Sequence, residues 1–582
     1  MKSINENERI NYLMGLILSS IICENNPKAK VDSVVFTEDG FYMDADLGDK
    51  TMSLNELPTL ENQIKKMLNN GIKYKKEKVS LKEAKKLFID NKYKLEKLLE
   101  FKNEVPIIKI NDYVDICDYE FEDLKECKVT KKDLFYSLSN SSTAYYKNDS
   151  NNIQLNRING IAFNSKEKLK EYIDYIEEAK KRDHRKIGKE LGLFMFDDTA
   201  PGMPYWLPNG WLLFNNLVDY WRNVHKKNGY MEFSGPQLNN SELWKISGHW
   251  DHYKDDMFVF RDADGQEQAL KPMSCPNAIK VYSSKTRSYK DLPLRFNDLD
   301  VIHRNEASGT LHGLLRVRMF RQDDSHNFIS ESQIKDECSN IFEMSKELYD
   351  AFGLKFRPAL STRPNDFMGD ISLWNKAENE LAEVLTENFG ENGFDVNEGD
   401  GAFYGPKIDL YMKDCLNREW QMGTIQLDFQ LPRNFNLSYI NNVGERDIPV
   451  IIHRTIYGSL ERFIGILTEH FNGAFPMWIS PTQVNIIPVN DGIELKQYIK
   501  DINEELEDSA IRTIIDDSNE KLGYKIRKSQ VEKIPMTFVI GNNEFEQSLI
   551  SYRNYGQKNT ITDEKSHVIN KVRKLAKPPY NK

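Results

Sequence analysis

Residues 301–328 constrain this chain more than any other stretch, because charged side chains stand where a buried strand would carry apolar ones. Its polar members are Arg304, Glu306, Arg316, Arg318, Asp323, Asp324 and His326, interleaved with Val301, Ile302, Leu314, Leu315, Val317, Met319 and Phe320. The alternation predicts two β-strands joined by a loop over residues 308–313, with one charged and one apolar face. A solvated hairpin would alternate in the same way. It would leave so many polar groups idle that we interpret the charged face as a binding surface.

The length and charge of the chain limit its class. A chain of 582 residues is expected to hold about three or four domains. It is 40% hydrophobic and 29% charged, a balance typical of folded proteins with large cores. The net charge of −10 argues against a protein that coats nucleic acid by bulk electrostatics, and we expect no DNA binding. Binding to tRNA through local basic patches remains allowed.

Cysteine spacing and hydropathy indicate the compartment. The six cysteines follow no disulfide or metal-finger spacing, which favours a reduced cytoplasm; they are Cys23, Cys117, Cys127, Cys275, Cys338 and Cys415. The apolar run over residues 12–23 is too short to span a bilayer and lacks a basic leader. It predicts a buried helix, and we expect no membrane association.

The first two segments of the chain mix element types. Residues 1–164 alternate short strands with helices, including a hairpin with a turn at Asp39-Gly40 and a helix that opens at Ser80 with Glu83 completing a capping box. Residues 165–192 carry apolar positions at helical spacing, then a basic run, and they end at Gly192. We interpret them as a helix that connects two domains.

The remaining segments predict two different sheets. Residues 193–479 show no regular βαβ alternation, which favours an antiparallel sheet with helices on it. Residues 480–582 alternate β-α-β-α-β and predict a separate α/β domain with a small parallel or mixed sheet. The whole chain is therefore expected to be an α+β multidomain protein.

The charged stretch, with its wording SG-x-LHG-x-x-RVR-x-F-x-QDD-x-H, resembles motif 2 of class II aminoacyl-tRNA synthetases, and threonyl-tRNA synthetases in particular. The resemblance runs from about residue 8 to the end. It implies a class II antiparallel-sheet catalytic core, a C-terminal anticodon-binding domain and an N-terminal editing-like domain. The implied reaction is ATP-dependent ligation of threonine to threonine tRNA through threonyl-adenylate.

Three residues far apart in the chain are implied to hold one zinc ion per subunit. They are Cys275, His326 and His453. Taken singly, each is more often a packed core residue, and their spacing carries no metal signal. Three protein ligands leave zinc an open position, which the amine and hydroxyl of the amino acid fill in this family. Such a site rejects valine strongly and serine only weakly, so serine is the expected error.

The resemblance also implies the residues that hold ATP, with Mg²⁺ on the triphosphate. They are Arg304, Glu306, Arg316, Phe320, Gln421, Thr424 and Arg462. Arg304 is expected to bridge the α-phosphate and the substrate carboxylate, a task that suits the bidentate guanidinium fork. Glu306 reads the adenine amino group, Phe320 stacks on adenine, and Arg316 takes the distal phosphates. Arg462 closes over ATP from the other side.

The implied amino acid pocket consists of Met273, Gln322, Asp324, Tyr404 and Gln426. Asp324 is expected to accept a hydrogen bond from the substrate hydroxyl or amine. Taken alone, Gln421 and Gln426 would be interpreted as polar side chains on a strand face, but beside Tyr404-Gly405-Pro406-Lys407 we favour the pocket. Catalytic roles are implied for Arg304, Arg462, Lys407 and His249, the last reaching toward the acceptor end of tRNA.

Further partners rest on the same resemblance. Pro236 matches the motif 1 proline at the dimer interface, which implies a homodimer. Asn519, Arg527 and Arg553 are candidate tRNA contacts in the C-terminal domain, because amide and guanidinium groups read and stack on bases. A solvated helix face explains Arg527 equally well.

The chain departs from the family in two places. We expect no ubiquitin-like domain at the front, and no histidine precedes His184, while Phe121 stands four residues after Cys117 where bacterial members carry histidine. Without imidazole the editing-like domain lacks a general base, and we expect little or no editing. Smaller departures at Ser274, Asn277, Ala278 and Met422 could alter substrate choice.

Two alternatives remain open. The changes at Asn277, Ala278 and Met422 allow a synthetase-like paralogue that activates another hydroxy amino acid or loads another carrier. A catalytically silent RNA-binding regulator is the third reading. Loss of Arg304, Arg462 or a zinc ligand would favour it, and all of them are present.

Overall fold

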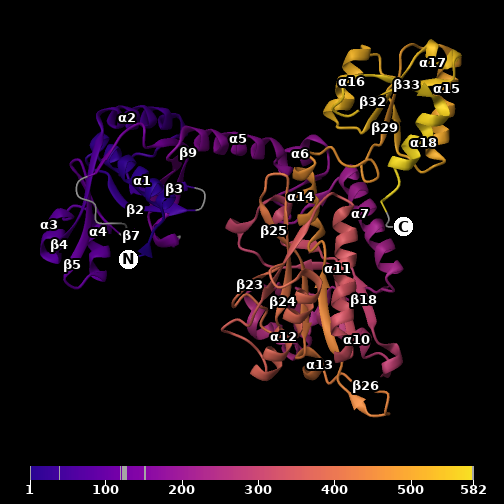
Figure 1. Ribbon diagram of the computed structural model, residues 1–582, viewed down its shortest axis with the longest axis horizontal. Coiled ribbons are helices and arrows are strands. Elements are labelled where there is room, and N and C mark those ends of the chain that lie inside the picture. The colour runs from indigo at the N-terminus through magenta and orange to yellow at the C-terminus, as the bar shows by residue number, and fades with distance from the viewer. Residues whose placement is uncertain (1, 38–39, 118, 121–126, 150–151, 580–582) are drawn as a thin grey trace. The chain divides into compact units, whose positions relative to one another are not determined.

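The computed structural model describes residues 2–37, 40–117, 119–120, 127–149 and 152–579. The chain divides into two compact units, Met1–Glu178 and Ala179–Lys582 (Figure 1). Among the helices in the described ranges, none combines the length and the apolar composition needed to cross a bilayer.

The N-terminal unit is built on the helix α1 (Glu6–Asn25), which confirms the buried helix predicted from the apolar run. Every residue of α1 from Ile10 to Ile22 is buried, as expected of a helix that is apolar on all sides. A capping box starts the helix, since the Asn5 side chain accepts the Glu8 N–H and the Glu8 carboxylate accepts the Asn5 N–H.

Two four-stranded antiparallel sheets complete this unit. The first has the order β2 (Lys30–Thr37), β3 (Gly40–Asp46), β10 (Gln154–Phe163) and β9 (Phe135–Tyr145). The second has the order β6 (Tyr113–Ile116), β5 (Glu104–Ile110), β4 (Ile72–Ser80) and β8 (Cys127–Val129). The short strands β1 (Lys2–Ser3) and β7 (Tyr119–Glu120) pair in parallel. The helices are α2 (Leu57–Asn70), α3 (Leu81–Leu87) and α4 (Lys92–Lys97).

Two local predictions in this unit can be compared with the structure. The predicted hairpin is confirmed by the antiparallel pairing of β2 with β3, although Asp39 of its turn lies outside the described residues. Ser80 caps α3 as predicted, because its hydroxyl accepts the Glu83 N–H at 3.2 Å.

The predicted single helix over residues 165–192 is wrong. Two helices stand there, α5 (Lys166–Arg182) and α6 (His184–Glu190). Asp183 separates them, because it leaves the helical conformation and its carboxylate accepts the Arg185 N–H at 2.8 Å. An aspartate that caps the next helix competes with continuation of the previous one.

An eight-stranded sheet forms the centre of the second unit. Its strand order is β13 (Met231–Glu232), β18 (Leu294–Asp298), β21 (Asp324–Ile329), β28 (Val450–Thr455), β25 (Glu419–Asp428), β24 (Lys407–Lys413), β22 (Phe356–Ser361) and β23 (Asp395–Asn397). Only the pairs β13–β18 and β22–β23, at the two edges, are parallel among these strands. The predicted antiparallel sheet is therefore confirmed.

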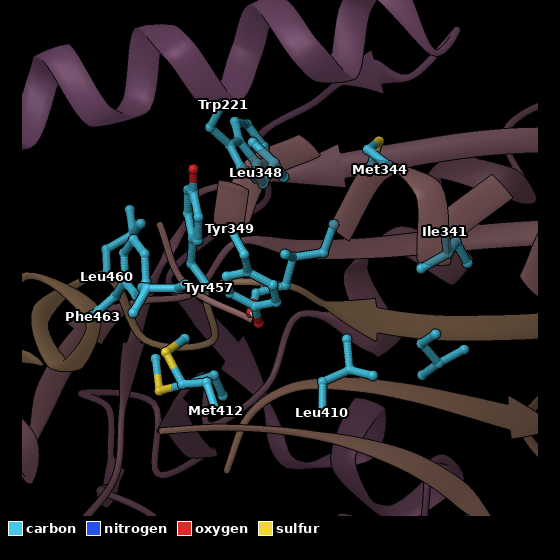
Figure 2. Close-up of a cluster of buried hydrophobic side chains, with 14 of the residues drawn as sticks. Trp221, Ile341, Met344, Leu348, Tyr349, Leu410, Met412, Tyr457, Leu460 and Phe463 are labelled. Atoms are coloured by element: carbon cyan, nitrogen blue, oxygen red, sulfur yellow. The ribbon is translucent and has the colours of Figure 1, made fainter. Parts of the chain in front are cut away.

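One face of this sheet is covered by α7 (Pro208–Lys227), α11 (Ile334–Asp350), α12 (Ile371–Phe389) and α14 (Leu460–His470). Apolar residues alternate along the strands toward these helices, among them Leu410 and Met412 of β24. In Figure 2 Tyr457 lies beside Leu460 and Phe463, and its ring stacks on Phe463 at a centroid distance of 4.2 Å. The residues that alternate with these apolar ones along each strand point to the opposite face of the sheet, which carries the site.

The structure of residues 301–328 differs in part from the predicted pair of strands. Its first two strands, β19 (Val301–His303) and β20 (Met319–Arg321), pair as expected, but the loop between them is longer and contains turns at Ser308–Thr310 and Gly313–Leu315. Leu314 and Leu315 are buried in these turns and do not form a strand. The following strand, β21, is buried on both faces because it lies inside the large sheet.

Shorter elements surround the sheet. The strands form three small sheets, β11 (Phe194–Met195) with β12 (Tyr205–Trp206), then β14 (Leu238–Asn240), β16 (Glu267–Leu270) and β15 (Val259–Arg261), then β17 (Arg287–Ser288), β26 (Tyr439–Ile440) and β27 (Arg446–Asp447). The helices are α8 (Ser241–Ile246), α9 (His249–Tyr253), α10 (Cys275–Tyr282) and α13 (Leu431–Asn434).

The C-terminal segment forms a mixed five-stranded sheet, as predicted. Its order is β30 (Thr513–Ile515), β29 (Val484–Pro488), β31 (Met536–Ile540), β32 (Leu549–Asn554) and β33 (Ile561–Glu564). The pairs β30–β29 and β29–β31 are parallel, and the pairs β31–β32 and β32–β33 are antiparallel. The helices are α15 (Ile493–Glu507), α16 (Leu522–Val531), α17 (Asn542–Glu546) and α18 (Lys565–Leu575).

Candidate active site

The polar face of the large sheet brings four predicted site residues into one row. His326 of β21 pairs with His453 of β28, which pairs with Gln426 of β25, which pairs with Lys407 of β24. Directly opposed residues on antiparallel strands project to the same side. Pairing register alone therefore gathers side chains that are far apart in the sequence.

Cys275 joins this row from the start of α10. The sulfur of Cys275 and ring nitrogens of His326 and His453 all lie within 4.8 Å of one another, and the three side chains are buried. The two imidazole rings are 5.0 Å apart between centroids and nearly perpendicular. Thiolate and imidazole are the ligands that Zn²⁺ prefers.

The imidazole nitrogens show that these residues fit a metal. Within the described chain, neither nitrogen of His326 has a hydrogen-bond partner, and Nδ1 of His453 also lacks one. His453 Nε2 contacts Asp428 Oδ2 at 2.9 Å. Buried polar atoms without partners are costly, whereas a histidine held by a carboxylate on its other nitrogen is typical of a metal ligand.

A cavity of about 470 Å³ opens in front of this cluster. Ten of its lining residues are predicted site residues, namely Met273, Cys275, Arg304, Gln322, Asp324, Tyr404, Lys407, Thr424, Gln426 and His453. His326 lies behind this surface, fully buried. Burial raises the pKa of Asp324 to about 6, while His453 opposes the rise.

A second cavity of about 470 Å³ adjoins the first. The predicted nucleotide residues that line it are Arg304, Glu306, Arg316, Phe320, Gln421, Thr424 and Arg462, together with Gln322. Four residues line both cavities, namely Arg304, Gln322, Thr424 and Thr455. The two cavities therefore share a wall, and Arg304 is its charged member.

The second cavity is suited to an anion. Arg316 pairs with Glu306, its Nε donating to Oε2 at 2.9 Å, and over half of the Arg316 side chain is exposed. Burial lowers the pKa of the Arg462 guanidinium, and Arg316 adds to this effect. Nε of Arg462 has no hydrogen-bond partner in the described part of the chain. Arginines with unused donors beside a cavity bind phosphate or carboxylate groups well.

Two buried aspartates organise the site, and the sequence reasoning missed both. Asp409 accepts hydrogen bonds from Gln421 at 2.6 Å and Thr424 at 3.3 Å, and it forms an ion pair with Lys407 at 2.9 Å. Asp428 holds His453. Each stands two residues after a predicted site residue on its strand, so the period of two could have indicated both.

The remaining predicted residues lie elsewhere. His249 is fully buried behind the first cavity, with Nδ1 at 2.8 Å from the Ser247 hydroxyl and Nε2 at 3.0 Å from the sulfur of Met273. Burial lowers the pKa of His249 to about 3. Asn519 and Arg527 are exposed on the C-terminal domain, and Arg553 donates to Thr560 at 2.7 Å. Their predicted contacts with tRNA stay predictions.

Three departures around Cys275 are not among the residues that line the two cavities. Ser274 donates to Asp298 at 2.8 Å, and Asn277 donates to the Pro236 carbonyl at 3.0 Å. Neither of them lines a cavity, and Ala278 does not either. Met422 does line the second cavity. This geometry weakens the expectation that Asn277 and Ala278 alter substrate choice.

Comparisons with known proteins agree with this geometry. Residues 258–471 match the family of the tRNA synthetase class II core domain (G, H, P, S and T), and residues 483–575 match the anticodon binding domain. A threonine–tRNA ligase of Thermotoga neapolitana is 44% identical over 92% of this chain and 83% of that protein. Threonine–tRNA ligase 2 of Bacillus subtilis is 44% identical over 89% of this chain and 80% of its own length.

Solved structures show the same likeness. A crystal structure described as the RNA binding domain of threonyl-tRNA synthetase from Cryptosporidium parvum superposes with a TM-score of 0.64 at 38% identity, covering 68% of this chain and 99% of that chain. A putative threonyl-tRNA synthetase from Aeropyrum pernix follows with a TM-score of 0.60 at 29% identity, covering 68% and 98%.

Proposed function

The chain belongs to the threonine–tRNA ligase family of class II synthetases, and from this premise we propose how its two joined cavities perform the reaction. The enzyme ligates threonine to threonine tRNA with ATP, which class II synthetases use with Mg²⁺. The observation that carries the proposal is the pair of cavities divided by Arg304, one beside the Cys-His-His cluster and the other lined with arginines.

We place threonine in the first cavity. Cys275, His326 and His453 would hold one zinc ion, which would supply Lewis-acid chemistry toward the amine and hydroxyl of the substrate. The contact of Asp428 with Nε2 of His453 fixes the orientation of the ring and would leave Nδ1 available to the metal. Asp324 accepts a hydrogen bond from the substrate. Gln426, whose Nε2 donates to the Gly405 carbonyl at 3.2 Å, supports the Tyr404 side of the pocket.

We place ATP in the second cavity. Phe320 stacks on adenine and Glu306 reads its amino group, while Arg316 and Arg462 neutralise the phosphates from two sides. Arg304, on the shared wall, contacts the α-phosphate and the threonine carboxylate together, so that the carboxylate oxygen can attack phosphorus and pyrophosphate can leave. Positioning and charge neutralisation supply most of the acceleration for such a transfer. Lys407, Gln421 and Thr424 are held in place by Asp409.

The tRNA and the second subunit are further parts of the proposal. Asn519, Arg527 and Arg553 would contact tRNA, and His249 would act near the acceptor end by holding Met273. A homodimer through the region of Pro236 is supported by the exposed side chains of Met231 and Leu238, which are 48% and 44% accessible. We expect a cytoplasmic location, since the enzyme needs ATP and tRNA.

Three domains, a connecting segment and an inactive editing region complete the proposal. We propose domains at residues 1–164, 193–479 and 480–582, with residues 165–192 connecting the first to the second. The first domain has no histidine. Its Cys117 is buried and lies with its sulfur 3.4 Å from the Tyr119 carbonyl, and Phe121 is outside the described residues. We therefore expect little or no hydrolysis of seryl-tRNA by this chain.

Pyrophosphate exchange with each amino acid, with and without a zinc chelator, tests the proposal. Threonine-dependent exchange that the chelator abolishes is the expected result. Exchange that depends on another hydroxy amino acid would instead support the paralogue. Absence of exchange with every amino acid in protein of full zinc content would overturn the proposal.

A further inference from the structure

A buried cluster outside both cavities joins three segments of the second unit. His184, the first residue of α6, is fully buried. Its backbone N–H donates to Glu469 Oε1 at 3.1 Å, and its Nδ1 lies 2.6 Å from the same oxygen. The Leu314 N–H donates to His184 Nε2 at 3.0 Å. Because a backbone N–H can only donate, Nε2 is the acceptor and the ring proton is on Nδ1, where it donates to Glu469.

This cluster is not a vacant metal site, although Asp183, His184 and Glu469 bring their ligand atoms within 4.8 Å of one another. Both imidazole nitrogens of His184 are already used in hydrogen bonds. Burial would raise the pKa of Glu469, but hydrogen bonds from His184 and Arg418 lower it below its ordinary value. Glu469 is therefore an ionised acceptor that His184 and Arg418 hold from two sides.

The two hydrogen-bond partners of His184 lie in the two chain segments that carry Arg316 and Arg462 of the nucleotide cavity. Leu314 stands two residues before Arg316, in the loop between β19 and β20. Glu469 is in the last turn of α14, and Arg462 is in the first turn of the same helix. A helix is a rigid spacer, so fixing one end of α14 against the loop also limits where Arg462 lies.

Gly313 shows that the contact with the loop is close. This residue has φ of +51°, and a Cβ at this position would lie 2.2 Å from Nε2 of His184. A side chain there would displace the imidazole from the Leu314 N–H. Only glycine allows both the left-handed backbone and this approach.

A second series of contacts, through Arg418, Asp414 and Trp420, connects Glu469 to Arg462. Arg418 bonds to Glu469 and donates to Asp414 Oδ2 at 2.7 Å. The indole N–H of Trp420 donates to the same Asp414 oxygen at 2.9 Å. The guanidinium of Arg462 lies 5.7 Å from the centroid of the Trp420 ring, within the range of a cation–π contact. Glu469 thus supports Arg462 through α14 and through Trp420.

We propose that His184 and Glu469 form a positioning pair that sets the Arg316 loop and the Arg462 helix at the spacing required by the phosphates of ATP. Neither residue lines the threonine cavity or the ATP cavity, so in this proposal both act through the arginines and do not touch the substrate. The inference rests on the proposed placement of ATP in the second cavity. It adds a role for the junction between α5 and α6, which no motif of the sequence indicated.

Two substitutions break the contact with the loop in different ways. His184→Asn keeps an amide donor near Glu469 but is too short to accept from the Leu314 N–H. Gly313→Ala leaves the histidine intact and displaces it. We expect each variant to raise KM for ATP about tenfold, the size of one lost buried hydrogen bond, with KM for threonine within about twofold of wild type. Both constants come from pyrophosphate exchange with the full chain.

His470→Asn is the matched control, because His470 adjoins Glu469 in sequence and its Nδ1 has no hydrogen-bond partner among the described residues. It should leave both constants unchanged. The dissociation constant of ATP, measured by calorimetry on protein with a wild-type melting temperature, should follow the same pattern. This second measurement separates failure of the inference from failure of the proposed function, since ATP binding is observed even without exchange.

The inference is wrong if ATP affinity in the folded variants stays within about twofold of wild type. It is also wrong if the constants for ATP and threonine rise together, because a merely structural defect would weaken both. Should His184→Asn fail to fold, Gly313→Ala gives the decision alone.

Discussion

Two buried polar clusters, one in each unit, differ in how they satisfy their own groups. In the N-terminal unit Lys94 and Asp115 form an ion pair with side chains only 4% and 2% exposed. The Tyr113 hydroxyl donates to Asp115 at 2.8 Å, and the Ile116 N–H donates to the same carboxylate at 2.7 Å. Both oxygens of this carboxylate have partners. At Cys275, His326 and His453 three ring nitrogens have none within the described residues.

This difference separates a cluster whose polar groups have partners within the protein from one in which three ring nitrogens lack them among the described residues. Burying a charge is tolerated only where partners compensate for lost water, and Asp115 has them inside the protein. His326 is buried to the same degree, and neither of its ring nitrogens has a hydrogen-bond partner in the described part of the chain. Under the proposed function a bound group would supply that compensation, since one thiolate and two imidazoles are ligands that zinc prefers.

Removing the metal should produce the largest effect. Cys275→Ser, or treatment with 1,10-phenanthroline, is expected to lower threonine-dependent exchange by at least about 10³-fold, because the hydroxyl-reading contact is lost. Metal analysis should give about one zinc per chain in the wild type and much less in the variant. Calorimetric ATP binding should persist.

Cys338→Ala is the control for that experiment, since Cys338 is also fully buried but lies in α11, away from the cluster. Its zinc content and exchange should match those of the wild type. An unchanged exchange rate in metal-free Cys275→Ser would contradict the assignment.

Breaking the ion pair between Lys94 and Asp115 should lower stability and leave activity unchanged. Lys94→Met leaves the Asp115 charge buried without its cation, and we expect the free energy of unfolding to fall by about 3–5 kcal/mol. Adding Asp115→Leu should recover most of this loss, because an apolar pair needs no compensation. Denaturant titration of the full chain measures both changes. A double variant less stable than the single one would show that the pair has a further role.

Weakening the contact between Asp428 and His453 should have a smaller effect, which is a loss of zinc affinity. In Asp428→Asn the amide would present a donor to His453 Nε2, and zinc affinity should fall by about 10–100-fold in competition with a chelating dye. Asp447→Asn, which changes a carboxylate that accepts from the Tyr439 hydroxyl at 3.1 Å, serves as control. Equal zinc affinity in the two variants would show that Asp428 does not support zinc binding.

The smallest effect is expected where residues 1–164 are tested for catalysis. Preformed seryl-tRNA should deacylate at nearly the uncatalysed rate in the presence of the purified chain, because residues 1–164 offer no imidazole base. Rapid hydrolysis that a substitution in residues 1–164 abolishes would refute this expectation.

Local patterns in the sequence predicted the elements well where one physical effect dominated. The apolar run of residues 12–23 could only be buried, and the change of periodicity after residue 480 marked a different sheet. The break at Asp183 was missed because capping depends on one side chain turning back to the next helix. Likewise, apolar Leu314 and Leu315 fit a strand equally well until the turn around Gly313 was visible.

The site was harder to derive than the fold. Nothing in the spacing of Cys275, His326 and His453 indicates a metal, since only the register of β21 against β28 and the position of α10 bring them together. The resemblance to a family identified them. It did not indicate Asp409 and Asp428, which contact site residues and not substrates, nor the contact between His184 and the loop at Leu314.

The wall shared by the two cavities has a consequence for inhibitor design. Because Arg304, Gln322, Thr424 and Thr455 face both spaces, a molecule in one cavity and a molecule in the other would contact the same four side chains. A single compound that joins an amino-alcohol head to a nucleoside would occupy both at once. Its second half would then bind at a high effective concentration, and its affinity would exceed that of either fragment by orders of magnitude.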